Sequence, residues 1–307
     1  MALSVNQLNA ITEKFFIKKL HDNIFDSNPL LMKIKKGGSY KSTSGGTQIY
    51  VPLNYATASA AGWYSGADTL STTDNDNVTA AAYDWASLFA GVSITEEDEL
   101  KNSGDAAQLN LLKSKMQIAE KTLSDSLGTG LFSDGTDAKS IVGLRDIVAT
   151  DQTVGGISQT TYSWWQGQVD STTTATSISA MNANYQNCVV DSEKPDYCAT
   201  TRTLFNAYYS LLQPQQRFQD DETASGGFQN LMFNGSPVVH DSHVPANHMF
   251  FLNLNHLHLF YHPSRNMAFE PFQKPINQQV KVSRILWMGA LGSSNNRLHG
   301  KLSALTS

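Results

Sequence analysis

The sequence predicts an α+β fold built around one long helix, and three observations carry this prediction. Apolar residues recur at steps of three and four between residues 105 and 127, which is the period of an amphipathic helix. The stretches 47–55 and 78–94 instead alternate apolar and polar residues, as strands do, and a long polar segment joins them. More alternating segments follow residue 236, and Gly, Ser, Thr, Asn and Gln are frequent, which favours strands and turns over a helix bundle.

The predicted helix has one apolar stripe, and charged residues lie off it. Gly128 follows the last apolar residue and is expected to end the helix in a left-handed conformation. A helix of this length is a rod of roughly 35 Å, long enough to cross a domain. The stripe consists of Leu109, Leu112, Met116, Ala119, Leu123 and Leu127.

Size and composition are those of an ordered protein of one or two domains. The 307 residues are 40% hydrophobic and 16% charged, and the chain can bury a large core. No signal-peptide pattern begins the sequence, and no apolar run approaches the ~18 residues of a membrane span. Cys188 and Cys198 form no metal or redox motif, so we expect two buried free thiols in a reducing cytoplasm.

The first 46 residues are predicted to form a basic arm and a flexible connector. An amphipathic pattern covers residues 4–36 and is broken at Asn28-Pro29, and residues 37–46 are rich in Gly and Ser. Seven lysines stand against three acids in residues 1–50. The lysines considered for contacts with other molecules are Lys14, Lys18, Lys19, Lys33, Lys35 and Lys36.

Residues 47–94 are predicted to form an extended hairpin with a long polar tip. In 47–55, Ile49, Val51 and Leu53 share one face, and Trp63 and Tyr64 lie near the middle of the tip. Such a hairpin has too little core to be stable alone, so we expect it to lie on another surface.

Charge is segregated along the chain, and this indicates what that surface is. Residues 51–100 carry eight acids and no Lys or Arg, whereas residues 251–307 carry six basic residues and one acid. Complementary patches steer association, so another copy of the chain fits, although each charge alone is equally explained as a solvated residue. The candidate contact residues are Lys14, Lys18, Lys19, Trp63, Tyr64, Asp68, Asp74, Asp76, Lys281, Arg284 and Arg297.

The remaining elements follow from local signals. Ser93 to Asp98 combines hydroxyl and acidic residues as a helix start does. The three glycines between 128 and 135 lack the ending of a phosphate loop and are expected to turn the chain into a short strand near 141–148. We further predict a helix over 177–190, a strand and then a helix within 195–212, strands at 237–240 and 249–259, and a closing pair of strands at 277–294 and 296–305.

The sequence offers little support for catalysis or metal binding. His240, Asp241, His243 and His248 are close in sequence, and His256 and His258 have the H-x-H spacing of some zinc sites, but no Glu or Cys completes a ligand set. No nucleophile motif occurs. Aromatic residues at 162–165 fit sugar stacking or, more commonly, a core. We therefore expect no enzyme, no cofactor and no metal.

The order of these segments resembles the major capsid protein of tailed bacteriophages, with its Hong Kong phage-type capsid fold. IFDSNPLLMKIKK followed by GGTQIYVPLNY is similar to that family's N-terminal arm and extension loop, and VSITEEDELKNS to its return strand and helix start. The 105–127 helix resembles the spine helix. FNGSPVVHDSHVP with HMFFLNLNHLHLFY is similar to the axial-domain sheet, and QVKVSRILWMGALGSSNNRLHGKL to the peripheral-domain strands that close the chain.

The resemblance implies five segments and a structural role. They are an N-terminal arm (1–46), an extension-loop β-hairpin (47–94), a peripheral domain with the spine helix (95–150), an axial domain (151–266) and a return to the peripheral domain (267–307). The implied function is self-assembly, through pentamers and hexamers, into the icosahedral shell of a virion that encloses double-stranded DNA without reading its sequence. Assembly would take place in the host cytoplasm, with a portal and no membrane, and the arm's lysines would face DNA, scaffold or a neighbour's acidic loop.

Two departures from relatives refine the expectation, and two other readings stay open. Residues 51–100 contain no lysine, so an isopeptide bond from an extension-loop lysine is impossible here. The pattern begins within a few residues of Met1, so we expect scaffolding to be a separate protein. The alternatives are an encapsulin-type compartment shell with protein cargo and, from another class, a sugar-acting β-rich enzyme or adhesin that would use Trp164 and Trp165.

Overall fold

The computed structural model describes residues 28–306 except 58, 72, 74–75, 102–104, 173 and 213–230, and leaves the side chains of 99–101 and 105–110 undescribed. The helices are α3 (Pro29–Lys36), α4 (Glu96–Lys101), α5 (Asp105–Leu131), α6 (Leu144–Ile147), α7 (Ile178–Asn187) and α8 (Arg202–Leu212), with 3-10 turns η1 (Ser163–Trp165), η4 (Pro263–Arg265) and η5 (Asn296–Leu298). The strands are β1 (Tyr40–Ser42), β2 (Gln48–Asn54), β3 (Val78–Asp84), β4 (Ala86–Thr95), β5 (Thr153–Val154), β6 (Ile157–Ser158), β7 (Gln168–Asp170), β8 (Thr174–Ala175), β9 (Tyr197–Thr200), β10 (Leu231–Phe233), β11 (Ser236–His240), β12 (Met249–Leu252), β13 (Leu257–Tyr261), β14 (Ala268–Gln273), β15 (Val280–Ser293), β16 (Gly300–Leu302) and β17 (Leu305–Thr306).

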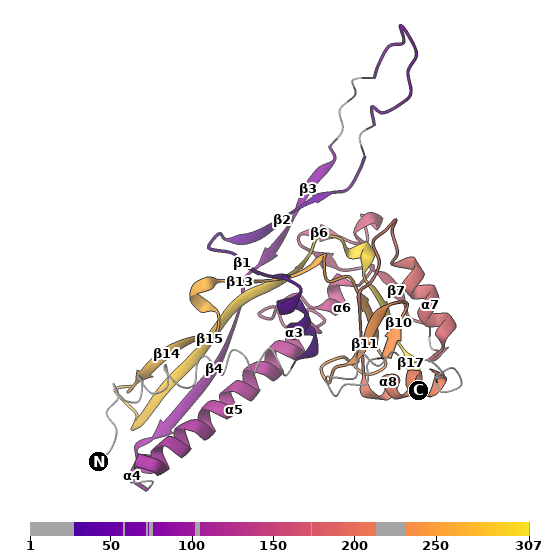
Figure 1. Cartoon of the computed structure of the whole chain (residues 1–307). Coiled ribbons are helices and arrows are strands. Elements are labelled where there is room, and N and C mark those ends of the chain that lie inside the picture. The colour runs from indigo at the N-terminus through magenta and orange to yellow at the C-terminus, as the bar shows by residue number, and fades with distance from the viewer. Residues whose placement is uncertain are drawn as a thin grey trace.

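The hairpin of β2 and β3 projects from the body of the molecule, and its tip extends well beyond the paired strands (Figure 1). The strands pair antiparallel from Gln48 with Asp84 to Asn54 with Val78. Ile49, Val51 and Leu53 are buried on one face, as their alternation predicts. Only the base of the hairpin therefore has a core to pack on within the subunit.

The first sheet has β15 as its longest strand and contains, among the described residues, β1, β13, β15, β14 and β4. β4 pairs antiparallel with β15 from Thr95–Val280 to Ala86–Gly289. Trp85 interrupts the strand between Asp84 and Ala86, and its indole Nε1–H donates a hydrogen bond to the Gly46 carbonyl oxygen at 3.1 Å. The expected second limb, 78–94, is thus two strands: β3 belongs to the hairpin and β4 to this sheet.

Helix α5 lies along β4, as Figure 1 shows, and buries the predicted stripe from Leu112 to Leu127. The prediction that it ends at Gly128 is wrong, because the helix continues to Leu131. Leu131 extends the buried stripe by one more turn. Gly128 lies inside the helix, where it makes room for a neighbouring side chain. A Cβ there would lie 2.6 Å from the ring of His243, so glycine is needed for close approach.

The start of the described chain is fastened to this helix. Pro29 opens α3 at its first position, where proline costs no hydrogen bond. Asn28 Nδ2 donates to the Ser124 carbonyl oxygen at 3.0 Å and to Ser124 Oγ at 2.9 Å. Leu30, Leu31 and Ile34 are buried, so α3 follows the pattern that the sequence resumes after Pro29.

The second sheet orders its strands β10-β11-β9-β12-β16-β7 within the described part of the chain. Helix α7 packs near β16 and β7, and α8 near β11. Ser177 caps α7 by accepting a hydrogen bond from the Ala180 N–H at 3.2 Å. The predicted helix over 177–190 and the strand-then-helix over 195–212 are confirmed by α7, β9 and α8.

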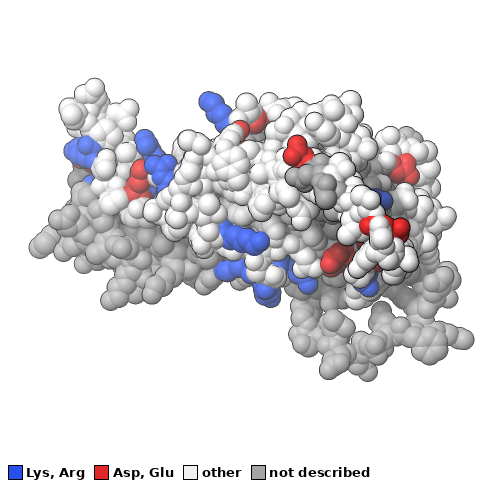
Figure 2. All heavy atoms as spheres, turned by 90° about the horizontal axis from the view of Figure 1, so that it is seen from above, with Lys and Arg blue, Asp and Glu red and all other residues white. Residues whose placement is uncertain are grey.

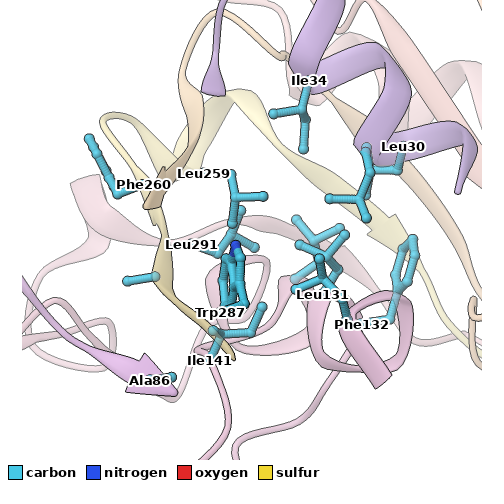
Figure 3. Packing of buried hydrophobic residues seen from close by; sticks show 14 of the residues in the cluster. Leu30, Ile34, Ala86, Leu131, Phe132, Ile141, Leu259, Phe260, Trp287 and Leu291 are labelled. Atoms are coloured by element: carbon cyan, nitrogen blue, oxygen red, sulfur yellow. The ribbon is translucent and has the colours of Figure 1, made fainter. Parts of the chain in front are cut away.

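The junction between the two sheets is apolar. Trp287 of β15 is buried beside Leu259, Leu291 and Ile141, and Figure 3 shows these side chains together with the end of α5. Phe132, just after α5, meets Phe250 of β12 with ring centroids 5.6 Å apart. One continuous core therefore links the first sheet, α5 and part of the second sheet.

Two strand predictions are wrong. Residues near 141–148 form the short helix α6, because Leu144, Ile147 and Val148 are buried at helical rather than alternating spacing. The single strand over 249–259 is two strands in different sheets. Asn253 breaks it: its Oδ1 accepts from the Asn255 N–H at 3.0 Å, and its Nδ2 donates to Glu193 Oε2 at 3.0 Å.

The end of the chain also differs from its expected place. β15 belongs to the first sheet, but β16 pairs with β12 and β7, and β17 pairs with β8. Residues 300–306 thus complete the second sheet and its small neighbour rather than staying in the first. The predicted closing strands do not pair with each other, because Asn295 and η5 redirect the chain between them.

Candidate assembly interface

The tip of the β2–β3 hairpin is the strongest candidate for a contact with another molecule. The Trp63 side chain is fully exposed, at 106% of its reference area, and Tyr64, Leu70 and Val78 are also exposed. Large apolar side chains that gather on one protruding element mark an interaction site more reliably than scattered ones do. Leu70 and Val78 were not among the sequence candidates, since isolated apolar residues in a polar segment give no periodic signal.

The tip is acidic as well as apolar. Asp68 and Asp76 are exposed, and Asp68 Oδ2 accepts a hydrogen bond from the Ser65 N–H at 2.9 Å, which shapes the turn. No Lys or Arg occurs from residue 51 to 100 to neutralise these carboxylates locally. Asp74 lies outside the described residues. The hairpin therefore offers aromatic and negatively charged groups on one element.

The predicted basic counterpart is not a single patch. Arg284 is exposed on β15, with its guanidinium 4.0 Å from Glu270 Oε2. Lys281 lies three residues earlier but is buried, at 9% exposure. Arg297 is exposed in η5, which follows the other end of β15. Lys281 and Arg284 lie near the start of the 14-residue strand β15, and Arg297 lies beyond its end. Because an extended strand rises by about 3.3 Å per residue, the three cations do not form one patch.

Another basic group lies on α3. Its last turn carries Lys33, Lys35 and Lys36, which are exposed, whereas Leu30 and Ile34 of the same helix are buried. Lys14, Lys18 and Lys19 lie outside the described residues. In the view of Figure 2 most of the described surface is uncharged, and the charged residues form small scattered groups.

The turn between β14 and β15 carries an exposed residue that the sequence reasoning missed. Ile276 is fully exposed between Pro275 and Asn277. The sequence did contain a signal for it, because an aliphatic residue between the turn-forming Pro275 and Asn277 is expected to be exposed. Lys274 donates to Glu96 Oε1 beside it, which joins this turn to the start of α4. The turn and the hairpin tip lie at opposite ends of the molecule (Figure 1), so one subunit cannot bring its two exposed apolar sites together.

The histidine-rich region is a set of separate structural contacts. Burial lowers the pKa of His299 to about 3 and that of His258 to about 4. His256 is held by a hydrogen bond between its Nδ1 and Ser294 Oγ, which are 2.9 Å apart. Within the described ranges, no three His, Cys, Asp or Glu side chains are grouped to hold a metal, and no described helix is long and apolar enough to cross a bilayer.

Comparison with known proteins gives matches through structure alone. No protein-family model matches the sequence, and no curated protein matches it. A chain of the cyanophage A-1(L) capsid superposes with a TM-score of 0.67 at 16% identity, covering 92% of this chain and 93% of that one. A chain of the satellite phage P4 procapsid with its size determination protein gives 0.54 at 14% identity, covering 98% and 96%.

An encapsulin has a comparable likeness. A chain of the SrpI encapsulin complex of Synechococcus elongatus superposes with a TM-score of 0.59 at 10% identity, covering 89% of this chain and 87% of that one. Chains from phage capsids and from an encapsulin thus superpose on most of this chain. At these identities the likeness establishes the fold, and the chain has the Hong Kong phage-type major capsid fold.

Proposed function

We propose that the protein is the major capsid protein of a tailed phage and self-assembles into the icosahedral shell that encloses packaged double-stranded DNA. The observation that carries this proposal is the β2–β3 hairpin, whose fully exposed Trp63 has no core to pack on in its own subunit. The fold likeness to phage capsid chains along nearly the whole length supports it.

The placement of the exposed sites favours assembly from head to tail. The acidic, aromatic hairpin tip is at one end of the subunit, and the β14–β15 turn with Ile276 and Lys274 is at the other. Contacts between different surfaces of identical chains close into rings when the rotation fits, and pentamers and hexamers are such rings. In this proposal the hairpin of one subunit lies on the first sheet of the next.

The proposed partners follow from the same role. The shell would encapsidate DNA through its inner surface without base contacts, and a portal and a separate scaffolding protein would act during assembly in the host cytoplasm. The arm's lysines and those of α3 would face DNA, scaffold or a neighbour's acidic loop. The division into arm, extension loop, peripheral domain and axial domain remains part of this proposal.

The second candidate is an encapsulin-type shell, favoured by the likeness to the SrpI encapsulin. Electron microscopy of the purified protein tests both candidates at once. Uniform closed particles are expected, whereas only monomers or irregular aggregates under all assembly conditions would contradict a shell protein. Particles isolated from infected cells and treated with nuclease should retain double-stranded DNA. Protein cargo without DNA would instead assign the chain to the encapsulin class.

A further inference from the structure

His243 lies where the second sheet meets the end of α5. It belongs to the turn between β11 and β12, and its imidazole lies between two carboxylates from different parts of the chain. Its Nδ1 is 2.8 Å from Asp241 Oδ1 in the same turn, and its Nε2 is 3.4 Å from Asp125 Oδ1 on α5. The ring therefore connects the helix to the turn through both of its nitrogens.

The two carboxylates differ in what surrounds them. The Asp241 side chain is buried and also accepts the backbone N–H of His243 at 2.9 Å. The Asp125 side chain is 78% exposed. Asp241 thus fixes the ring from inside the turn, while Asp125 contacts the ring from α5. Across the same groove the 133–145 segment contributes Asp134, Asp137, Lys139 and Arg145.

The backbone of α5 is shaped to accept this ring. At Gly128 any Cβ would lie 2.6 Å from the His243 Cε1 and Nε2 atoms, so the imidazole packs directly on the helix. Asp125 is three residues earlier on the same helix, which places it on the same side. Gly128 thus leaves the space that the imidazole occupies, and Asp125 supplies the carboxylate beside it; together they form the imidazole site on α5.

The apolar contacts beside this imidazole site do not depend on pH. Val244 is buried next to His243 in the core that includes Leu127, and Phe132 contacts Phe250. The imidazole adds a contact whose strength depends on its charge, because a protonated ring donates to both carboxylates and a neutral ring donates to one only. Hydrogen bonding to Asp241, together with the charges of Asp241 and Asp125, raises the pKa of His243 above its ordinary value although burial opposes this.

We propose that protonated His243 is a latch that ties α5 to the β11–β12 turn, and that the latch opens as the pH rises. Because the fold raises the histidine pKa, the stabilisation is fully present below the pKa of the unfolded chain, ~6.5, and is lost as the pH rises through the higher pKa of the folded state. Acidic conditions therefore hold the helix and the second sheet together more firmly than alkaline conditions do.

The decisive variant is Asp125→Asn, because it removes the cross-helix charge and leaves the buried Asp241–His243 pair intact. We expect its melting temperature to fall by about 1–3 °C at pH 5.5 and to match the wild type at pH 8.5. Glu120→Gln is the control, since it makes the same acid-to-amide change on the same helix and should show no pH-dependent difference. Equal losses at both pH values, or none at either, would overturn the latch.

Hydrogen exchange localises the effect. After correction for the intrinsic rate, amides of 241–248 and of the last two turns of α5 should lose protection between pH 5.5 and pH 8.5 in the wild type, and Asp125→Asn should already lack that protection at pH 5.5. Unchanged protection of both segments in the wild type would contradict the proposal. Both measurements use the purified chain in whatever assembly it forms, so they are independent of the proposed function.

Discussion

At the residue scale, Tyr83 fastens the base of the hairpin to the end of β15. Its hydroxyl donates to the Ser293 carbonyl oxygen at 2.9 Å and accepts the Ser293 N–H at 3.0 Å. The ring is buried, and burial raises the pKa of the phenol, so the group is neutral and keeps both roles. Ser293 is at the last position of β15, and its backbone groups are satisfied by this single hydroxyl.

Tyr83→Phe should therefore lower the free energy of unfolding by ~1–3 kcal/mol, because it leaves a buried N–H and a buried carbonyl without partners. Denaturant unfolding of the purified protein measures this. Tyr50→Phe is the matched control: its hydroxyl reaches Gln48 Oε1 at 3.2 Å on the exposed face of β2, so its loss should cost almost nothing. Equal effects of the two variants would mean that the Ser293 contacts do not stabilise the chain.

At the element scale, α5 has two faces that contribute very differently to stability. Leu123 is completely buried, whereas Ile118 is 61% exposed on the same helix. Leu123→Ala should destabilise the protein by ~2–5 kcal/mol through lost burial and the cavity left behind. Ile118→Ala should change stability by less than ~0.5 kcal/mol. Thermal unfolding checks both, and a large cost at Ile118 in dispersed subunits would show that this face packs on something.

The hairpin tip should behave in the opposite way, with little effect on the subunit and a large effect on assembly. Trp63→Ala removes a side chain that touches little in its own subunit, so the unfolding of dispersed subunits should be unchanged while the yield of closed particles falls. Particle yield by sedimentation measures this, with Met232→Ala, an exposed apolar residue of β10, as the control. Normal yield from the Trp63 variant would remove the tip aromatic from the assembly contact.

Elements with a clear period were predictable, and those that depend on distant partners were not. The stripe of α5 and the alternation of β2 each report one buried face, so sequence alone identified them. Gly128 misled because glycine permits both a helix end and a close approach, and only the His243 ring distinguishes the two. The split at Asn253 depends on Glu193, sixty residues away, and no local pattern contains that partner.

For the candidate assembly interface, the sequence indicated the chemical character of the hairpin tip but not where the basic residues lie. The acidic and aromatic tip was inferred from composition; Trp63 and Tyr64 are exposed there, and their contact with another subunit stays a prediction. The basic counterpart was inferred from counting charges, which ignores that Lys281 is buried and that Arg297 lies past the far end of β15. Strand pairing decided these positions, and pairing partners distant in the chain leave no trace in local composition.

At the scale of the whole molecule, the absence of lysine from 51–100 sets how a shell of this chain would be held together. An isopeptide bond from the proposed extension loop needs a lysine amine there, and none is present. Particles boiled in detergent should therefore run on a denaturing gel as a single band near the chain mass of 33.6 kDa. A ladder of linked oligomers would refute this, and particles from a relative that does crosslink provide the positive control.

The pairing of β4 with β15 has a consequence for how the protein is made. β4 ends at Thr95 and its partner strand begins at Val280, so the ribosome releases one strand long before the other exists. At ~5–20 residues per second, the nascent β4 waits on the order of 10–40 s with an open edge. Newly made chains should therefore need shielding by a chaperone until translation nears its end, even though the finished subunit covers that edge itself.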